Sequence, residues 1–389
     1  MPATTNPVHH LPTSLSEFHV QRSQKLLQDN FLADSRPWVV AYSGGKDSTL
    51  VLQLVYEMLL DLPVQRLKPV YVIASDTRVE VPAIEAYLAE RIQTLTAHAA
   101  HSGLPLYPRL VTPGPEQDFW YNLIGKGYPP PTRWFRWCTS KMKIKPVKAS
   151  IENIITEYGS VILLLGTRSD ESQSRGRRMN ARELSSRQLN PHQEIPNALV
   201  LSPIADWTSD QVWEYLYSNT PPWGGNHDFM LNLYRQANGG ECPVVMDLNT
   251  PSCGGSRFGC WTCTVVKTDK SMESFIENGE AWMAPLNRYR NWLKDIREDE
   301  TRRSPYRRGE EGKRGEHWRE GLGPFIASTR LELLVKLLET ERAADYRLIS
   351  DENINTIQAC WTKEFDVSDS AYLIAEKYGR EPWKRLHKP

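Results

Sequence analysis

Short apolar runs alternate with longer amphipathic stretches through the first half of the chain. The stretches between the runs are long enough to hold helices, and the first of them is rich in leucine. Such alternation is typical of an α/β fold built on a doubly wound, mostly parallel sheet. The apolar runs that we predict to be its buried strands are residues 38–43, 70–74, 107–111, 161–165 and 199–201.

Ligands of a doubly wound sheet bind at the carboxyl ends of its parallel strands. The loops that follow the predicted strands should therefore converge on one site. All but one of these loops carry polar residues suited to ligand binding, and the exception is the loop at Thr112. The loops begin at Ser43, Ser75, Thr112, Gly166 and Ser202.

The second half of the chain has a different pattern. Helical spacing predicts helices in 209–219 and from 271 to the end, most clearly in 325–341. Residues 221–259 are rich in Gly, Pro and Asn, which predicts a region too irregular for long elements, and a bound metal would supply the order it lacks. The Arg-, Glu- and Gly-rich stretch 297–323 is expected to form a mobile surface loop.

These patterns predict four parts along the chain. They are an N-terminal helical segment with one short helix (1–35), an α/β domain (36–220), a cysteine-rich region (221–285) and a helical C-terminal region (286–389).

The composition is that of a folded, soluble protein. Hydrophobic residues make up 40% and charged residues 24% of the 389 residues, which excludes collagen-like, coiled-coil and wholly disordered chains. Lys+Arg and Asp+Glu are both 47, so any attraction to nucleic acid must come from a local basic patch. No apolar run is long enough for a membrane span and no signal-peptide pattern is present, so we expect a cytoplasmic location without membrane association.

Residues 43–48 read Ser-Gly-Gly-Lys-Asp-Ser, between a predicted strand and a predicted helix. The start of a helix presents N–H groups that bind anions. Gly44 and Gly45 let the backbone approach a phosphate closely, the two serines add hydroxyl donors, and Lys46 adds a positive charge. The spacing does not fit the Walker A motif, which argues against a conventional P-loop kinase or motor. We predict a site for nucleotide phosphates here.

Four of the six cysteines form a cluster with the spacing C-x10-C-x6-C-x2-C. Four thiolates can complete a tetrahedral metal shell or hold an iron-sulfur cluster, and nearby glycines allow the chain to wrap around it. Structural zinc sites usually have two C-x2-C pairs, so the single pair favours iron-sulfur over zinc, with free thiols as the third alternative. The predicted metal ligands are Cys242, Cys253, Cys260 and Cys263.

Cys138 lies apart from this cluster, in a basic and aromatic segment. It is either a small buried hydrophobe or a nucleophile that carries a persulfide and whose thiolate the nearby cations stabilise. Residues 126–148 hold seven basic and no acidic residues, interleaved with aromatic ones, a composition suited to a nucleic-acid backbone. The alternative is that these charges serve only nucleotide phosphates or face solvent. The predicted DNA-binding residues are Arg133, Arg136, Lys141, Lys143, Lys145, Arg175, Arg177 and Arg178.

The Ser-Gly-Gly-Lys-Asp-Ser run resembles the PP-loop of the ATP pyrophosphatase and adenylyl-sulfate reductase superfamily, which has the adenine nucleotide alpha hydrolase-like fold. Three further stretches resemble the same superfamily in the same order, namely 73–81, 166–172 and 203–213. The resemblance implies that ATP is bound by Ser43, Gly44, Gly45, Lys46, Asp47, Ser48, Asp76, Thr77, Gly166 and Arg168.

The PP-loop together with the cysteine spacing is similar to the DndC and SspD family of sulfurtransferases in bacterial DNA phosphorothioation, over residues 20–290. This resemblance implies a [4Fe-4S] cluster on the four cysteines and cleavage of ATP, with Mg²⁺, to AMP and pyrophosphate. A DNA backbone phosphate would be adenylated and then receive sulfur from a cysteine desulfurase. Lys46 and Arg168 would stabilise charge on the α phosphate, Asp47 would hold the metal or cap the helix, and Cys138 is the candidate persulfide carrier.

Three other functions remain open from the sequence. One is reduction of sulfonucleotides (APS or PAPS), although the chain has no adjacent Cys-Cys pair and no Glu-Cys-Gly-Leu tail. The second is thiolation of tRNA, and the third is a non-catalytic DNA-binding subunit that only senses ATP. The implied partners are DNA, the desulfurase and other proteins of the phosphorothioation system. The role of the cluster, the DNA sequence and strand state, and whether the chain forms a homo-oligomer stay undecided.

Overall fold

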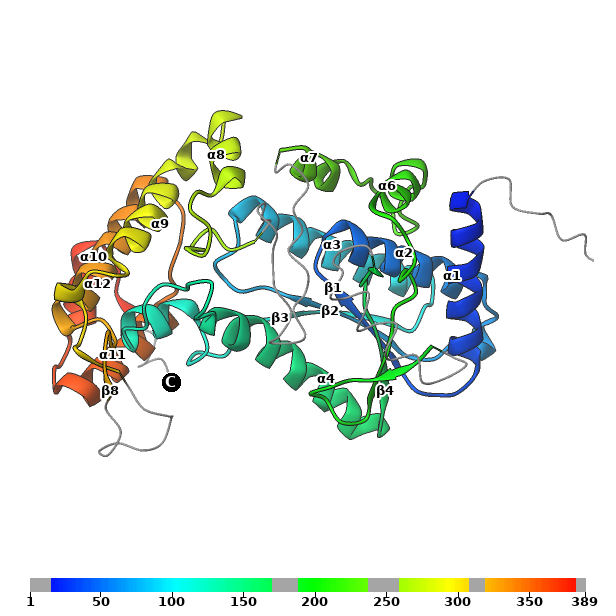
Figure 1. Ribbon diagram of the computed structural model, residues 1–389, viewed down its shortest axis with the longest axis horizontal. Helices are drawn as coiled ribbons and strands as arrows, with labels where there is room; N and C mark the ends of the chain where they lie inside the picture. Colours follow the sequence, from blue (N-terminus) through cyan, green and yellow to red (C-terminus); the bar gives the residue numbers. More distant parts are fainter. Residues whose placement is uncertain (1–14, 170–187, 237–258, 308–318, 383–389) are drawn as a thin grey trace, which may run out of the picture. The chain divides into compact units, whose positions relative to one another are not determined.

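The computed structural model describes residues 15–169, 188–236, 259–307 and 319–382 (Figure 1). Contacts divide the chain into two compact units, which are described separately. Unit 1 contains Met1–Ala74, Arg91–Arg109 and Ile151–Met230, and unit 2 contains Ser75–Glu90, Leu110–Ser150 and Leu231–Pro389. Each unit is thus built from several separate stretches of the chain. The four parts predicted along the sequence stay a prediction.

A six-stranded sheet has the order β3-β2-β1-β4-β6-β5. β1 pairs in parallel with β2 and with β4, β4 pairs in parallel with β6, and the short β5 is antiparallel to β6. The doubly wound, mostly parallel α/β fold predicted from the sequence is therefore confirmed, and a strand lies at each of the five predicted runs. The strands are β1 (Trp38–Tyr42), β2 (Val70–Ser75), β3 (Leu106–Val111), β4 (Val161–Leu164), β5 (Asn190–Pro191) and β6 (Ala198–Leu201).

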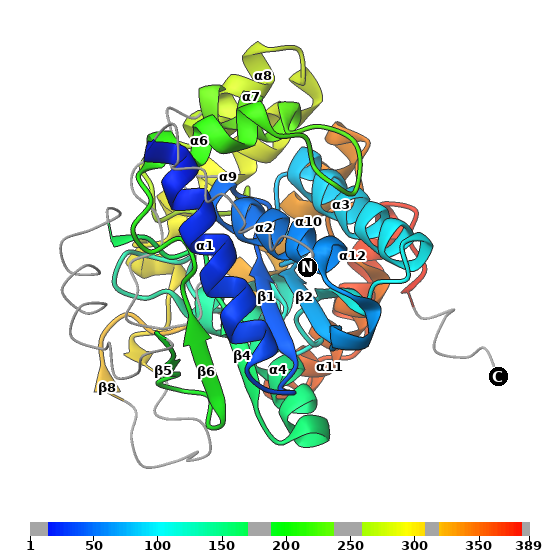
Figure 2. The same ribbon diagram turned by 90° about the vertical axis from the view of Figure 1, so that its right-hand side faces the viewer.

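Three helices of unit 1 pack together on one face of the sheet: α1 (Leu15–Leu32), α2 (Lys46–Asp61) and α6 (Ser209–Ser218) (Figure 2). Trp207 joins α1 to the loop before α6, because its indole Nε1–H donates to Ser23 Oγ at 2.9 Å. Ser23 Oγ in turn donates to the carbonyl of Pro203 at 2.7 Å. These contacts between distant residues stabilise α1, which extends well beyond the short helix predicted from its sequence.

A polar network in unit 1 joins two residues of α2, Gln53 and Glu57, to Tyr215 of α6 and to His227. His227 is 5% exposed, and its Nε2 lies 2.9 Å from the amide oxygen of Gln53. Gln53 also donates to Glu57, which accepts from the hydroxyl of Tyr215 at 2.6 Å. Burial, with Arg91 nearby, lowers the pKa of His227 from 6.5 to about 4. The folded protein therefore holds this imidazole neutral at pH values where an unfolded chain would protonate it.

We predict from this network that stability falls as the pH drops from about 6.5 to about 4. The unfolded chain binds a proton at His227 within this window and the folded chain does not, so each pH unit lost costs at most roughly 1.4 kcal/mol. Urea unfolding across the window measures the effect. In His227→Gln this component should vanish, whereas His101→Gln, at an exposed position of the same unit, should retain it. An unchanged pH profile in His227→Gln would contradict the prediction.

Unit 2 is mainly helical, which confirms the helices predicted for the C-terminal region. Its complete α-helices are α8 (Lys270–Glu277), α9 (Ala284–Ile296), α10 (Ala327–Ala344), α11 (Asp351–Phe365) and α12 (Ser370–Lys377). Three α-helices contribute to both units: α3 (Pro82–His101), α4 (Lys145–Tyr158) and α7 (Asp228–Gln236). The shorter elements are η1 (Val64–Arg66), η2 (Tyr121–Gly125), η3 (Thr139–Ile144), η5 (Ala281–Met283), η6 (Glu300–Arg302), β7 (Tyr306–Arg307) and β8 (Arg319–Glu320).

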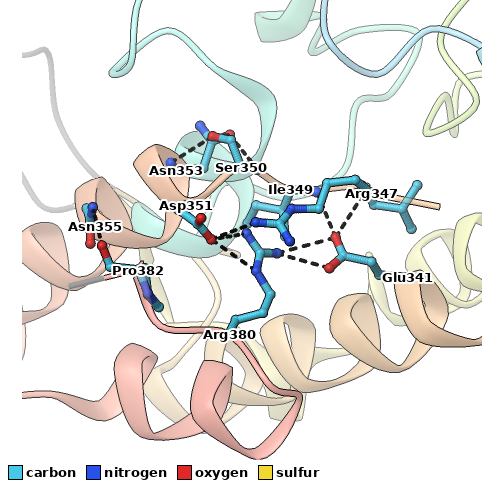
Figure 3. Close-up of polar contacts among 10 residues, drawn as sticks. Glu341, Arg347, Ile349, Ser350, Asp351, Asn353, Asn355, Arg380 and Pro382 are labelled. Carbon is cyan, nitrogen blue, oxygen red and sulfur yellow. Dashed lines mark hydrogen bonds and ion pairs between the residues drawn. The ribbon is translucent and has the colours of Figure 1, made fainter. Parts of the chain in front are cut away.

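Buried arginines organise the C-terminal part of unit 2. Arg380 lies between Glu341 of α10 and Asp351 of α11, with donor–acceptor distances of 3.0 Å from NH1 to Glu341 Oε1 and 3.1 Å from Nε to Asp351 Oδ1 (Figure 3). Arg303 is likewise buried and donates to the carbonyls of Arg297 and Leu322 at 2.6 and 3.1 Å. Arg303 thereby joins the two described ends of the stretch 297–323, which was expected to form a mobile surface loop. Residues 308–318 of this stretch lie outside the described part.

Two further expectations bear on the architecture. The region 221–259 was predicted to be too irregular for long elements, yet it contains the whole of the nine-residue helix α7. Residues 237–258 of that region are outside the described part of the chain. No helix among the described residues is long and apolar enough to cross a membrane.

Candidate functional site

The predicted phosphate loop is a turn between β1 and α2 in unit 1. Gly44 has a φ of 76°, a left-handed conformation that glycine adopts at little cost. Gly45 N–H donates to Ser43 Oγ at 3.3 Å, and Ser48 Oγ donates to the carbonyl of Gly45 at 2.9 Å. The two serine hydroxyl oxygens are 3.0 Å apart. These bonds hold the turn in place at the start of α2, where helix N–H groups without intrahelical acceptors favour an anion.

Three charged side chains meet beside this turn. Lys46, Asp47 and Arg168 are only 2%, 6% and 4% exposed. Lys46 Nζ is 2.9 Å from Asp47 Oδ2, and Arg168 Nε is 2.6 Å from Asp47 Oδ1. Asp47 therefore pairs with both cations that the sequence assigned to the α phosphate. The N-cap of α2 is Gly45, so the alternative that Asp47 caps this helix is wrong.

The same cluster lies at the topological switch point of the sheet. The chain leaves β1 for β2 and later returns to β4 on the other side of β1, and ligands of doubly wound folds bind where the strand order reverses. Arg168 follows β4, so it comes from the second of the two strands that define this point. The loops after β4 and β6 also meet, because the hydroxyls of Thr167 and Ser202 are 2.7 Å apart.

Gly166 allows the loop after β4 to pack against the start of α2. A Cβ at this position would lie 2.8 Å from the carbonyl carbon of Asp47 and 2.9 Å from the backbone nitrogen of Ser48. Because both neighbours are backbone atoms, they cannot move aside as a side chain could. The sequence identified Gly166 as a binding residue, but this close packing is visible only in three dimensions.

We predict that Gly166→Ala destabilises the protein by about 1–3 kcal/mol, the usual cost of overpacking. The added methyl group must push the Arg168 loop away from the phosphate turn, so the predicted binding of ATP should weaken as well. Denaturant unfolding and nucleotide titration measure the two effects. Gly114→Ala is a suitable control, because a Cβ there meets no atom within 4 Å. Equal stability of the two variants would show that the close packing carries no energy.

The other two predicted ATP-binding residues, Asp76 and Thr77, follow β2 in unit 2. Asp76 accepts from the backbone N–H of Arg78 at 2.7 Å, and burial raises the pKa of its carboxyl group. Thr77 is fully buried; its hydroxyl donates to Glu80 at 2.9 Å and lies 3.3 Å from the sulfur of Cys260. Thr77 thus contacts Cys260, one of the predicted metal ligands. A contact of Asp76 or Thr77 with a nucleoside stays a prediction.

Cys260 and Cys263 form the described half of the predicted metal-binding set. The backbone N–H of Cys263 donates to the carbonyl of Cys260 at 3.1 Å, so the C-x2-C pair closes a tight turn. Backbone bonds also join this turn to residues 79–81. Neither thiol forms a disulfide with a described cysteine. Two neighbouring thiols on a tight turn fit the sulfur ligands that iron-sulfur clusters and zinc require.

Cys242 and Cys253 lie outside the described residues. Within the described part of the chain, no three His, Cys, Asp or Glu side chains gather closely enough to hold a metal ion. The described pair supplies two of the four predicted ligands, and the binding of a cluster stays a prediction.

Cys138 belongs electrostatically to the same site. Burial, with a further contribution from Cys263, raises the pKa of the Cys138 thiol to about 11, and nearby Lys143 offsets only part of this rise. This direction is opposite to the stabilised thiolate that was one of the two alternatives predicted for Cys138, and agrees with the other, a small buried hydrophobe. Cys138 is partly buried, and its role as a persulfide carrier stays a prediction.

We call the group of Cys138, Cys260 and Cys263, with the residues that contact it, the thiol site. Two residues of this site, Glu80 and Arg290, were not predicted from the sequence. Glu80 is 4% exposed, lies 3.8 Å from the sulfur of Cys260, and its Oε2 has no hydrogen-bond partner within the described ranges. Arg290 of α9 is fully buried and donates to the carbonyls of Cys263 and Lys267 at 2.8 and 3.1 Å. Arg290 thereby fixes the chain after the C-x2-C turn. An arginine on the buried face of an amphipathic helix was the available signal.

The predicted DNA-binding residues divide by position. Arg133 and Lys145 are exposed, whereas Arg136, Lys141 and Lys143 are partly buried. Lys141 Nζ lies 5.6 Å from the ring centre of Tyr128, and Lys143 Nζ lies 3.6 Å from Glu80 Oε1. The structure thus places these five on one segment of unit 2. The three remaining residues, Arg175, Arg177 and Arg178, lie outside the described residues.

Comparison with curated proteins gives two relatives of similar identity. The chain is 27% identical over 65% of its length to the uncharacterized protein MJ0066 of Methanocaldococcus jannaschii, and 28% identical over 64% to MJ0973 of the same organism. It spans less than half of these relatives, 42% and 47% of their respective lengths.

Among solved structures, phosphoadenylyl-sulfate reductase of Candida auris is 16% identical, with a TM-score of 0.34 over 57% of this chain and 93% of that one. FMN adenylyltransferase of Candida glabrata is 15% identical, with a TM-score of 0.34 over 59% of this chain and 65% of that one. The U34-tRNA thiolase NcsA of Methanococcus maripaludis, which carries a [4Fe-4S] cluster, is 15% identical, with a TM-score of 0.33 over 56% of this chain and 74% of that one.

The profile of the phosphoadenosine phosphosulfate reductase domain family matches residues 37–266. This match covers more than half of the chain and includes the whole switch-point site, from the phosphate turn to Arg168. On this evidence the protein belongs to the phosphoadenosine phosphosulfate reductase domain family.

Proposed function

We propose that this protein is the sulfurtransferase subunit of a DNA phosphorothioation system. In this proposal it cleaves ATP to AMP and pyrophosphate in order to activate a DNA backbone phosphate, which then receives sulfur. The observation that carries the nucleotide part is the buried group of Lys46, Asp47 and Arg168 beside a phosphate-type turn at the switch point. The basic, aromatic segment 126–148 and the thiol site support DNA and sulfur as the other reactants.

The phosphates of ATP would bind at residues 43–48, with Lys46 and Arg168 next to the α phosphate. Cations held in a buried site stabilise the negative charge that develops there more strongly than they could in water. Both now pair with Asp47, so phosphate binding would replace part of this pairing. Asp47 would then be able to coordinate the Mg²⁺ that accompanies ATP.

The proposed reaction has three steps. A non-bridging oxygen of a DNA phosphate attacks the α phosphorus, a P–O bond forms, and pyrophosphate leaves. A persulfide derived from a cysteine desulfurase then attacks the adenylated DNA phosphorus, and AMP leaves with the former DNA oxygen. The resulting P–S–S linkage is cleaved by a second thiol, which is oxidised to a disulfide while the DNA keeps its sulfur as a phosphorothioate. The reaction therefore consumes one persulfide and one reducing thiol for each ATP.

The thiol site would serve the sulfur half of this reaction. Cys260 and Cys263, with Cys242 and Cys253, would hold a [4Fe-4S] cluster, and Arg290 would fix the turn that carries the first pair. A bound cluster of this type supplies one-electron chemistry. Cys138, whose thiol pKa is raised by burial and further by Cys263, would be the thiol that carries the persulfide.

The test uses anaerobically purified protein, ATP, a cysteine desulfurase with cysteine, and DNA. Pyrophosphate release that DNA stimulates, and phosphorothioate dinucleotides found by mass spectrometry after nuclease digestion, would support the proposal. Stimulation by tRNA instead of DNA would favour tRNA thiolation. Absence of pyrophosphate release under every condition would overturn the proposal and leave an ATP-sensing, DNA-binding subunit.

A second function is favoured by the family profile, which is that of a sulfonucleotide reductase domain. In that case the phosphate turn would bind APS or PAPS, and the products would include sulfite. Incubating the protein with either sulfonucleotide and a thiol or ferredoxin reductant distinguishes the two functions. Sulfite release without any ATP cleavage would replace the phosphorothioation proposal with this one.

A further inference from the structure

An exposed indole stands out on the basic segment of unit 2. Trp134 is 91% exposed, more than any other large hydrophobic side chain in the described part of the chain, and the adjacent Phe135 is 46% exposed. Large apolar side chains are costly to leave in water, and a prominent exposed aromatic often marks an interaction site. Trp134 has no part in the phosphate turn or the thiol site.

Local hydrogen bonds hold the backbone under this side chain. Thr132 Oγ1 accepts from the backbone N–H groups of Trp134 and Phe135 at 3.2 and 3.0 Å. The backbone N–H of Thr132 donates to the carbonyl of Phe135 at 3.2 Å. The exposed indole is therefore presented by a closed turn whose backbone needs little further ordering when a ligand binds.

Contacts at the base of the turn fix it to the rest of unit 2. The carbonyl of Pro131 accepts from Thr264 Oγ1 at 2.7 Å and from Arg297 NH1 at 3.2 Å. On the other side, Trp137 Nε1–H donates to the carbonyl of Pro129 at 2.9 Å. Both ends of the turn are thus anchored, and only its tip, with Trp134, projects into solvent.

The charge around the tip indicates what the indole binds. The seven basic residues and no acidic residue of 126–148 favour a polyanion. Arg133, exposed and immediately before the indole, places its guanidinium carbon 5.7 Å from the centre of the Trp134 ring. A cation beside an exposed aromatic ring matches the alternation of phosphate and base along a nucleic-acid strand.

We propose that Trp134 stacks on an unpaired base of the DNA substrate while Arg133 contacts an adjacent backbone phosphate. The base must be unpaired because both faces of a base inside a duplex are already covered by its neighbours. The inference rests on the proposed function for the identity of the nucleic acid and adds that the DNA is bound in a single-stranded or locally opened form.

The test compares DNA strands with and without a base. Fluorescence anisotropy would measure binding of a labelled single-stranded oligonucleotide and of the same oligonucleotide with abasic sites. Base–aromatic stacking is worth about 1–3 kcal/mol per base, so wild type should prefer the intact strand by at least about 5-fold. Trp134→Ala should lose this preference and leave abasic binding unchanged, and Trp134→Tyr should restore much of it.

Two further variants separate stacking from charge. Arg133→Ala should reduce the salt dependence of binding by about one phosphate contact, whereas Trp134→Ala should not change it. Tyr217→Ala removes an aromatic that is 74% exposed in unit 1 and should bind both strands as wild type does. Thermal unfolding followed by circular dichroism checks that the variants fold.

Several outcomes would overturn the inference. One is Trp134→Ala binding intact DNA as wild type does, and another is equal weakening of intact and abasic strands. A third is loss of desulfurase binding with unchanged DNA binding, which would make the indole a protein contact. Pyrophosphate release and phosphorothioate formation by wild type are measured separately. If wild type forms phosphorothioate but Trp134→Ala binds normally, only the stacking inference fails; if wild type does neither reaction, the proposed function fails.

Discussion

Replacing Lys46 with alanine is expected to lower the rate of pyrophosphate release from ATP by about 10²–10³-fold. Removing one preorganised donor from a site where charge develops costs a reaction about this much. Lys46 is 2% exposed, so water cannot readily take over its role. Asp47 keeps its bond to Arg168 in the variant, which leaves no buried charge without a partner, and the protein should still fold.

The controls for this prediction separate charge from geometry and from general damage. Lys46→Arg keeps the charge but not the shape of the ammonium group, and should recover only part of the activity. Lys25→Ala removes an exposed lysine that pairs with Asp29 on α1, and should have full activity. Wild-type rates in Lys46→Ala would show that the turn only senses nucleotide. That result would favour the non-catalytic DNA-binding subunit.

The sequence predicted most of what the sheet requires, because strands and the helix after the phosphate turn leave a local pattern. Five apolar runs located five strands, and Ser43 to Ser48 located the turn between β1 and α2. The doubly wound arrangement followed from the alternation of strands and helices, but the order β3-β2-β1-β4-β6-β5 was not predicted. The pairing of Arg168 with Asp47 was not predicted, although the two residues follow the neighbouring strands β4 and β1.

What the sequence could not predict depends on contacts between distant residues. The length of α1 depends partly on Ser23 and Trp207, which are far apart in the chain. Glu80 reaches Cys260 only because backbone bonds join their two segments. The sequence left two alternatives for Cys138, a buried hydrophobe and a thiolate stabilised by nearby basic residues, and burial has the larger effect on its pKa in the folded chain. The sequence shows which charged residues are near Cys138 along the chain, but it does not show how far the folded protein shields the thiol from water.

If the four cysteines hold the proposed iron-sulfur cluster, replacing Cys263 with serine is expected to abolish that cluster in the anaerobically purified protein. A serine oxygen is a poor substitute for a thiolate on iron, and Arg290 holds the backbone of this residue through its carbonyl, so another residue cannot easily take its place. Iron and sulfide assays and the absorption spectrum report the loss independently of any activity. Cys360→Ser, in α11, is the matched control and should retain the full centre.

Cys138→Ser distinguishes the two roles that thiols have in the proposed reaction. If Cys138 carries persulfide, this variant keeps its iron and still releases pyrophosphate, but no sulfur reaches DNA. Its high pKa in the resting structure means that the thiol must lose its proton or change its surroundings before it can accept sulfur. Loss of iron in Cys138→Ser would instead make it a ligand of the centre. Because Cys263 raises its pKa, the two thiols are near enough for either result to be physically reasonable, and the iron content decides between them.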